Sequence, residues 1–183
     1  MKKLKEKIIL FLECFFTWKV KKDKKNKPEE AYIYFCLSFG YGKDHSDSNN
    51  QALALVLKKY YLQRKAIIIT QKEIANYLSD VIINFTISKH RKESKYLDTF
   101  EVCQQCFDYC QDINLKEILI FAHPNHLWRI KKTMEKLGAK ISIADTSSCP
   151  YNKKSKQIWT RNKFFFIIRE LFVRLYYLFS GKI

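Results

Sequence analysis

The residues of this sequence best suited to chemistry on an anion are His126 and Arg129, which lie three positions apart. On a helix, that spacing places both side chains on one face. Arginine offers a fixed fork of hydrogen-bond donors, and histidine changes its charge near neutral pH. We therefore interpret the pair as a candidate site that binds and polarises an anionic group. The alternative is a pair on a helix surface with no ligand.

The elements that must position this pair are found in residues 116–138. Residues 117–122 form an apolar run that is typical of a fully buried strand. The turn His123-Pro124-Asn125 follows, and Pro124 suits the first position of a helix that closes at Gly138. The sequence thus predicts a crevice where a parallel strand ends and a helix begins. His123 is ambiguous, because a residue before proline also serves the turn itself.

The rest of the chain repeats this alternation of strand and helix. Further strands are predicted at residues 31–37, 66–69, 81–87 and 139–144. Three helix starts match capping boxes, in which a capping residue lies three before Gln or Glu: Ser48 with Gln51, Thr70 with Glu73, and Asp98 with Glu101. The pattern predicts a Rossmann-like, three-layer α/β/α fold with a mostly parallel sheet of about five strands.

Other side chains could take part in chemistry. Glu73 and Glu101 begin helices after strands, so either is a candidate general base beside His126, although capping alone explains both. Cys103, Cys106 and Cys110 have a spacing that suggests metal binding, but a helical stripe of core residues accounts for them better. The polar loop that holds Asp44, His45 and Asp47 carries a weaker metal signal, and we predict no metal site.

The two ends of the chain carry most of its net charge of +16. Residues 1–30 hold ten Lys or Arg against five acids, and residues 151–183 hold eight against one, so the ends contribute +12. The apolar stretch within residues 2–20 is too short to span a membrane, which takes about 20 apolar residues. It predicts a helix that either lies in a membrane interface or packs on the domain. We expect residues 1–30 to be a basic leader helix and linker, and residues 31–183 to be one α/β domain that includes an apolar C-terminal helix.

Several of these segments together resemble the YdcF/SanA/ElyC-like family of bacterial envelope-associated proteins, over about residues 31–183. The similarity rests on SFGYGKDHSDSNNQALAL, IIITQKEIANYL, the tail RELFVRLYYLFSGKI, Thr99-Phe100-Glu101, and most specifically on His126, Arg129 and Gly138. Two departures alter the expected pocket. The family usually carries a glycine pair where this chain has Thr70-Gln71-Lys72, and commonly an arginine where it has Gln51.

The resemblance implies the same Rossmann-like fold and a role in envelope or polyprenyl-phosphate metabolism. We expect a phosphate-bearing or nucleotide-like ligand in the crevice. In a catalytic version, His126 acts as acid or base, Arg129 neutralises developing charge, and Glu101 or Glu73 is the partner. The expected ligand-binding residues are Gly40, Gly42, Asn49, Thr70, Gln71, Thr99 and His123. No particular cofactor follows from the sequence.

Whether the protein is an enzyme stays open at this point. The alternative is a non-catalytic, membrane-associated scaffold or binding protein whose pocket is degenerate. Binding of nucleic acid through the basic ends lacks a recognisable motif and is the least favoured hypothesis. We expect a cytoplasmic protein whose basic, aromatic ends hold it at the inner face of the cytoplasmic membrane.

Overall fold

The computed structural model describes residues 2–18, 20, 33–41, 48–88, 97–115 and 117–183. Their core is a five-stranded sheet in which every pair of neighbours is parallel. The strands are β1 (Ile33–Cys36), β2 (Ile67–Gln71), β3 (Phe85–Ile87), β4 (Glu117–Phe121) and β5 (Lys140–Ile143). Their order across the sheet is β3-β2-β1-β4-β5, so the predicted Rossmann-like α/β fold is confirmed.

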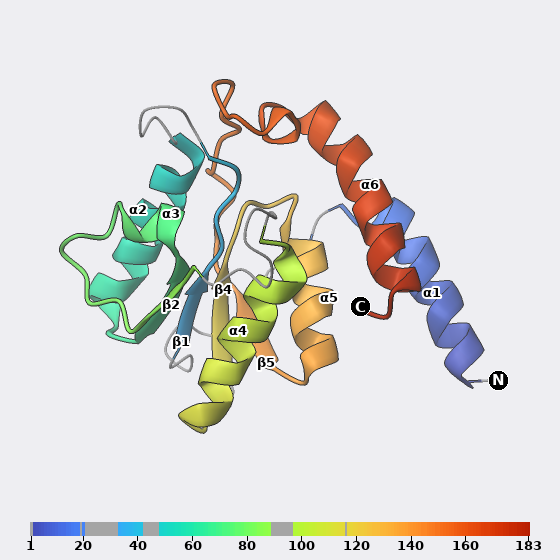
Figure 1. Ribbon diagram of the computed structural model, residues 1–183, viewed down its shortest axis with the longest axis horizontal. Helices are drawn as coiled ribbons and strands as arrows, with labels where there is room; N and C mark the ends of the chain where they lie inside the picture. The colour runs from blue at the N-terminus through green and yellow to red at the C-terminus, as the bar shows by residue number, and fades with distance from the viewer. Residues whose placement is uncertain (1, 19, 21–32, 42–47, 89–96, 116) are drawn as a thin grey trace.

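Helices cover both faces of this sheet (Figure 1). Helices α2 (Ser48–Gln63) and α3 (Lys72–Ala75) lie on one face, and α4 (Thr99–Asp112) and α5 (Leu127–Leu137) lie on the other. The chain after β5 then crosses the carboxyl edge of the sheet through a short 3-10 helix, η2 (Ile158–Thr160). Helix α6 (Lys163–Phe179) runs back beside α1 (Lys2–Phe16), at the side of the molecule that carries α5.

Alternate side chains of the strands build a separate core on each face, as the pleat of a strand requires. Tyr34 and Cys36 of β1 pack in the cluster that includes Leu53 and Leu57 of α2. The neighbouring Ile33 and Phe35 belong to the opposite cluster, together with residues of α4 and α5. The stripe of Cys103, Cys106 and Cys110 lies in this second cluster, which confirms its interpretation as core.

Three predicted elements are wrong in their extent. The strand expected at residues 81–87 is limited to β3, because the side chain of Asn84 caps the edge of β2 and accepts a hydrogen bond from Ile68 N at 2.9 Å. The helix expected around Ile74 is the single turn α3. Pro124 does not begin α5, which starts at Leu127 after a turn that His126 N closes on His123 O at 2.8 Å.

The helix ends are only partly as predicted. Asp98 and Glu101 form a full capping box at the start of α4, and Gly138 closes α5 with a φ of +92°. The box predicted for Thr70 is wrong, because Thr70 lies within β2 and its hydroxyl donates to Cys36 O at 3.0 Å. Ser48 is the first residue of α2, and the residue before it lies outside the described part of the chain.

The N-terminal helix α1 packs on the domain. Cys14 of α1 is fully buried against Tyr177 of α6 and Trp128 of α5, and Glu13 pairs with Lys132 of α5 at 2.6 Å. Much of the remaining apolar surface of α1 is exposed to solvent. Among the described residues, neither α1 nor any other helix has the length and apolar character to cross a bilayer.

Candidate functional site

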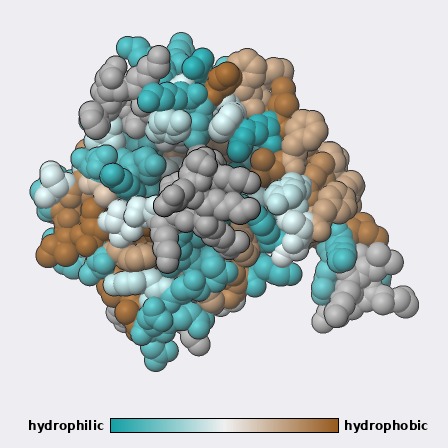
Figure 2. Space-filling model, viewed as in Figure 1, coloured by the Kyte–Doolittle hydropathy of each residue, from teal (hydrophilic) through white to brown (hydrophobic). Residues whose placement is uncertain are grey.

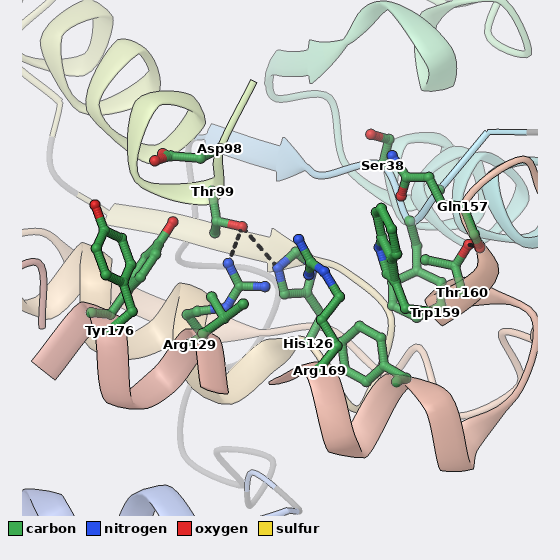
Figure 3. Close-up of a pocket in the computed structure, with 15 residues that line it drawn as sticks. Ser38, Asp98, Thr99, His126, Arg129, Gln157, Trp159, Thr160, Arg169 and Tyr176 are labelled. Atoms are coloured by element: carbon green, nitrogen blue, oxygen red, sulfur yellow. Dashed lines mark hydrogen bonds between the residues drawn. The ribbon is translucent and has the colours of Figure 1, made fainter. Parts of the chain in front are cut away.

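The site is a cavity of about 180 Å³ at the carboxyl edge of the sheet, between the ends of β1 and β4. Here the chain leaves β1 toward one face and β4 toward the other, and such a switch point is where parallel α/β sheets bind ligands. The walls come from residues 38–40 after β1, from the starts of α4 and α5, and from η2 and α6, which close the outer side (Figure 3).

Three predicted residues meet in this cavity. The hydroxyl of Thr99 lies 3.0 Å from His126 Nε2 and accepts a hydrogen bond from Arg129 Nη1 at 2.6 Å (Figure 3). Thr99 is the first residue of α4. His126 directly precedes α5, and Arg129 lies in the first turn of that helix. The helical spacing of the His–Arg pair therefore does bring both side chains to one point, as the sequence predicted.

Arg129 is held by a carboxylate from the C-terminal helix. Its Nε and Nη2 atoms donate to Glu170, with a shortest distance of 2.9 Å, and Glu170 also accepts from Arg174 Nε at 3.2 Å. Glu170 and Arg174 are fully buried, so one carboxylate serves two buried guanidinium groups. Burial alone would lower the pKa of Arg129, but Glu170 outweighs it and raises that pKa above its usual value.

Arg174 extends this network to the N-terminal helix. Its Nη1 donates to the carbonyl oxygens of Cys14 at 3.3 Å and Thr17 at 2.8 Å, where α1 ends. Its guanidinium also lies between the rings of Trp18 and Trp128, at 4.2 and 4.4 Å from their centroids. Hydrogen bonds thus form a chain from the end of α1, through Glu170 and Arg129, to the cavity.

Further charges flank the cavity. Arg169 of α6 lines it and lies 4.4 Å above the ring of Trp159 from η2. Asp98 also lines it and is bound by Lys182 at 2.7 Å. Burial raises the pKa of Asp98, but the hydrogen bond from Lys182 and a backbone hydrogen bond bring it below its usual value. The carboxylate is therefore ionised and paired at neutral pH.

Both histidines of the β4–α5 turn are neutral at pH 7. Burial lowers the pKa of His123 to about 3. Burial, and then the nearby Arg129, hold the pKa of His126 well below its ordinary value. Depending on its tautomer, the neutral imidazole of His126 either accepts a hydrogen bond from the Thr99 hydroxyl or donates one to it.

A second cavity of about 390 Å³ adjoins the first. Gln71, Lys72 and Glu73 line it, and it shares Ser38, Gly40 and Gln157 with the first cavity. Gln157 is 5% exposed, and its side-chain oxygen makes no hydrogen bond within the described structure. An unsatisfied buried polar atom costs about 1–3 kcal/mol, so Gln157 is a polar group of the shared wall that a small shift of its side chain could offer to a ligand.

Sequence analysis missed Gln157, because it lies between β5 and α6 in a segment with no motif. The sequence marks Gln157 only by its position six residues before α6 begins, at Lys163.

Gly40 is required where the chain leaves β1. Its φ is +76°, and an added Cβ would lie 2.4 Å from Thr160 Oγ1. The glycine therefore permits a close approach to Thr160 of η2, and Gly40 also lines both cavities. Gly42, the other predicted glycine, lies outside the described residues, as do Asp44, His45 and Asp47.

Several other predicted site residues have structural partners. Asn49 donates to Phe39 O, and its neighbour Asn50, which the sequence did not single out, binds Phe39 N at 2.8 Å and Gly40 O at 2.9 Å. Gln71 accepts from Ser38 N at 2.9 Å. His123 stacks on Phe39 with the ring centroids 3.8 Å apart. These contacts fix the β1 loop and do not by themselves bind a ligand.

The proposed catalytic carboxylates are placed elsewhere. Glu101 accepts from Asp98 N at 3.2 Å in the capping box and is not a wall of the cavity that contains His126. Glu73 lines the second cavity, and Thr70 lines neither. The carboxylate that does act on the His126–Arg129 pair is Glu170, which contacts Arg129 from a helix 41 residues further along.

The burial of His123 makes stability depend on pH. In the unfolded chain this imidazole has its ordinary pKa of 6.5, whereas in the folded protein its pKa is about 3. Between pH 3 and pH 6.5, therefore, His123 is protonated in the unfolded chain and neutral in the folded protein. Stability should therefore fall as the pH drops below 6.5. From pH 7 to pH 5 this histidine alone should cost about 2 kcal/mol.

Urea unfolding of wild type and of His123→Phe at both pH values measures this contribution. The variant keeps a stacking ring and should lose about 2 kcal/mol less than wild type on acidification. An equal loss in the two proteins would contradict the buried, neutral state of His123.

Comparisons of the chain with protein-family models, with curated proteins and with solved structures find no match.

Proposed function

We propose that this protein binds a phosphate-bearing or nucleotide-like small molecule in the crevice at the carboxyl edge of its sheet. The observation that carries the proposal is an excess of positive charge around a partly enclosed cavity. Arg129 and Arg169 line the cavity together with one carboxylate, that of Asp98. Behind this wall, Arg174 pairs with Glu170 and Lys182 pairs with Asp98, so four cations at and behind the wall face two carboxylates. The difference of two positive charges favours an anion, and partial burial strengthens that attraction.

The size of the site supports a ligand with a phosphate and a second group. The first cavity, about 180 Å³, has room for about six waters at roughly 30 Å³ each, which suits a phosphate or diphosphate. The second cavity adds about 390 Å³, and the shared wall of Ser38, Gly40 and Gln157 offers backbone and amide groups between the two. Together they approach the volume of small-molecule pockets, about 300–1,000 Å³.

The chemistry at the bottom of the site suits proton transfer to or from the ligand. In the catalytic form of the proposal, His126 is the acid or base and Arg129 stabilises developing negative charge. The contact between Thr99 and both residues supports this role, because it orients the imidazole and the guanidinium toward one hydroxyl. The carboxylate partner in this form is Glu170, which positions Arg129, and not Glu73 or Glu101, which the sequence suggested as general bases beside His126.

The biological setting in this proposal comes from the sequence resemblance to YdcF/SanA/ElyC-like proteins. On that basis we propose a role in envelope or polyprenyl-phosphate metabolism, with the protein in the cytoplasm at the inner membrane face. The positive cavity supports the phosphate in this setting, whereas the prenyl part rests on the resemblance alone.

A second candidate is a non-catalytic scaffold or binding protein with a degenerate pocket. The existing partners of Arg129 favour this candidate, since Glu170 and Thr99 already accept hydrogen bonds from its Nε, Nη1 and Nη2 atoms. The start of α4 is also occupied, because Phe100 N donates to Tyr177 Oη and Glu101 N donates to Asp98. In this case anions would bind no more tightly to the crevice than to the basic surface.

Calorimetric titration with inorganic pyrophosphate separates the two candidates. Arg169→Gln removes a cavity cation without disturbing the buried Glu170 pair, and Lys153→Gln removes an exposed cation outside the cavity. We expect Arg169→Gln to weaken binding about tenfold or more, because a charge-assisted hydrogen bond contributes about 1.5–3 kcal/mol. Equal affinities of the two variants would assign the binding to general surface charge and reject the crevice.

A further inference from the structure

Exposed apolar side chains are concentrated on two helices. Of the sixteen large hydrophobic residues that are strongly exposed in the described structure, eleven belong to α1 and α6. On α6 they are Phe164, Phe165, Ile168, Phe172, Tyr176 and Phe179. We call the exposed apolar surface of α6 and α1 the α1–α6 ridge. Figure 2 shows its hydrophobic residues as a band along one edge of the molecule.

The spacing on α6 produces a continuous stripe. Phe164, Ile168, Phe172 and Tyr176 recur every four residues, so they lie above one another on one face. The opposite face carries Phe166, Glu170, Arg174 and Tyr177, all buried. The helix is thus fixed by its buried face, and the stripe is left without a partner among the described residues.

The exposed apolar residues of α1 are Ile8, Ile9, Phe11, Leu12 and Phe16. The two helices contact each other through the buried cluster of Cys14 and Tyr177 and run beside each other at one side of the molecule. A Phe or Tyr side chain presents about 150–250 Å² when fully exposed, so these eleven exposed apolar residues together exceed the few hundred Å² that monomers ordinarily expose.

The charges around the ridge identify what covers it. On α6 the sole acid is Glu170, which is buried, while Lys163 at the helix start and Arg161 just before it are exposed. On α1, exposed Lys5 and Lys7 lie beside the apolar stripe on either side of one exposed acid, Glu6. Apolar side chains bordered by cations match the interface of a bilayer with anionic headgroups. A second copy of the chain would bring the same cations together, which is unfavourable.

The ridge also adjoins the candidate site. Tyr176 is 58% exposed on the ridge and at the same time lines the first cavity, and Arg169 lines that cavity one residue after Ile168 of the ridge. A surface that rests on headgroups would therefore bring the mouth of the positive cavity to the level of lipid phosphates.

We propose that the α1–α6 ridge is an interfacial membrane-docking surface that seats this protein on a bilayer containing anionic lipids. Phe, Ile and Leu side chains of the ridge enter the boundary between headgroups and acyl chains, and the flanking lysines and arginines contact lipid phosphates. The docking of the ridge on a bilayer does not depend on the proposed function. Only the idea that the cavity takes its ligand from the headgroup layer rests on it.

Flotation of the full chain with vesicles tests this inference. Vesicles of phosphatidylcholine alone are compared with vesicles that contain 30% phosphatidylglycerol. Phe172→Glu places a charge in the middle of the ridge, and Leu62→Glu on α2 is a matched control, since both native side chains are 68% exposed. We expect the wild type and Leu62→Glu to bind the anionic vesicles, and Phe172→Glu to bind them at least tenfold more weakly.

Two outcomes would overturn the proposal. Equal vesicle binding by Phe172→Glu and wild type would show that charge alone attracts the protein. A stable dimer of the wild type that Phe172→Glu dissociates, with no vesicle binding, would assign the ridge to a second copy. A second variant, Phe172→Gln, removes the same apolar ring without adding a charge three residues from Arg169. Its titration with pyrophosphate keeps the two proposals apart, because the crevice should retain wild-type affinity even when docking is lost.

Discussion

Replacing Glu170 by glutamine is expected to reduce the free energy of unfolding by about 3–5 kcal/mol. Glu170 is the single carboxylate between two buried guanidinium groups, at 2.9 Å from Arg129 and 3.2 Å from Arg174. Glutamine keeps the size and one acceptor oxygen but removes the charge. Two buried cations are then left without a counter-charge, and that desolvation cost makes breaking such a pair expensive.

Urea unfolding followed by circular dichroism measures this effect. Glu135→Gln is the control, since Glu135 forms a half-exposed pair with Lys131 within α5 at 3.6 Å and should contribute about 0.3–0.5 kcal/mol. A loss below 1 kcal/mol for Glu170→Gln would contradict a charge network that fixes α6 and Arg129. The same variant should also weaken pyrophosphate binding, because Arg129 loses the partner that orients it.

Replacing Gly40 by alanine should cost about 2–5 kcal/mol. A left-handed φ costs an L-residue about 1–2 kcal/mol, and overpacking adds about 1–3 kcal/mol. Both apply here, because the φ is +76° and the new Cβ would lie 2.4 Å from Thr160 Oγ1 and 2.9 Å from Ser155 Oγ. The displaced Thr160 belongs to the cavity wall, so ligand binding should weaken as well.

Gly138→Ala separates the two contributions. Gly138 has a φ of +92°, but nothing lies within 4 Å of the Cβ that alanine would add. Thermal unfolding of both variants should therefore show a loss of about 1–2 kcal/mol at Gly138 and a clearly larger one at Gly40. Equal losses of unfolding free energy in the two variants would mean that Thr160 leaves room for a Cβ atom at position 40.

The sequence predicted the parts of the fold that depend on local pattern. The sequence shows short apolar runs of four to six residues that alternate with helices. This alternation indicates a parallel sheet, because neighbouring parallel strands must be joined by a crossover connection, usually a helix. The pairing of His126 with Arg129 was predictable for the same reason, since it follows from helical spacing. The boundary errors lie where a side chain overrides propensity, as Asn84 does at the edge of β2.

The rest of the site depends on contacts that are distant in sequence. The spacing of Glu170 and Arg174 allows a pair within one helix, but nothing in the sequence indicated that Arg129 would complete it from 41 residues away. Gln157 is likewise recognisable only from its burial between two cavities. The capping signal of Glu101 is genuine, and the structure shows that it occupies the side chain that the sequence suggested for catalysis.

The measurement that tests the central claim most directly is the pyrophosphate titration of the wild type followed by ¹H–¹⁵N correlation spectra. The account predicts that the amide signals of Ser38, Gly40 and Thr99, and the Arg169 side-chain signal, shift together and saturate with one affinity. Shifts confined to the lysine-rich ends, with those four signals unmoved, would contradict it.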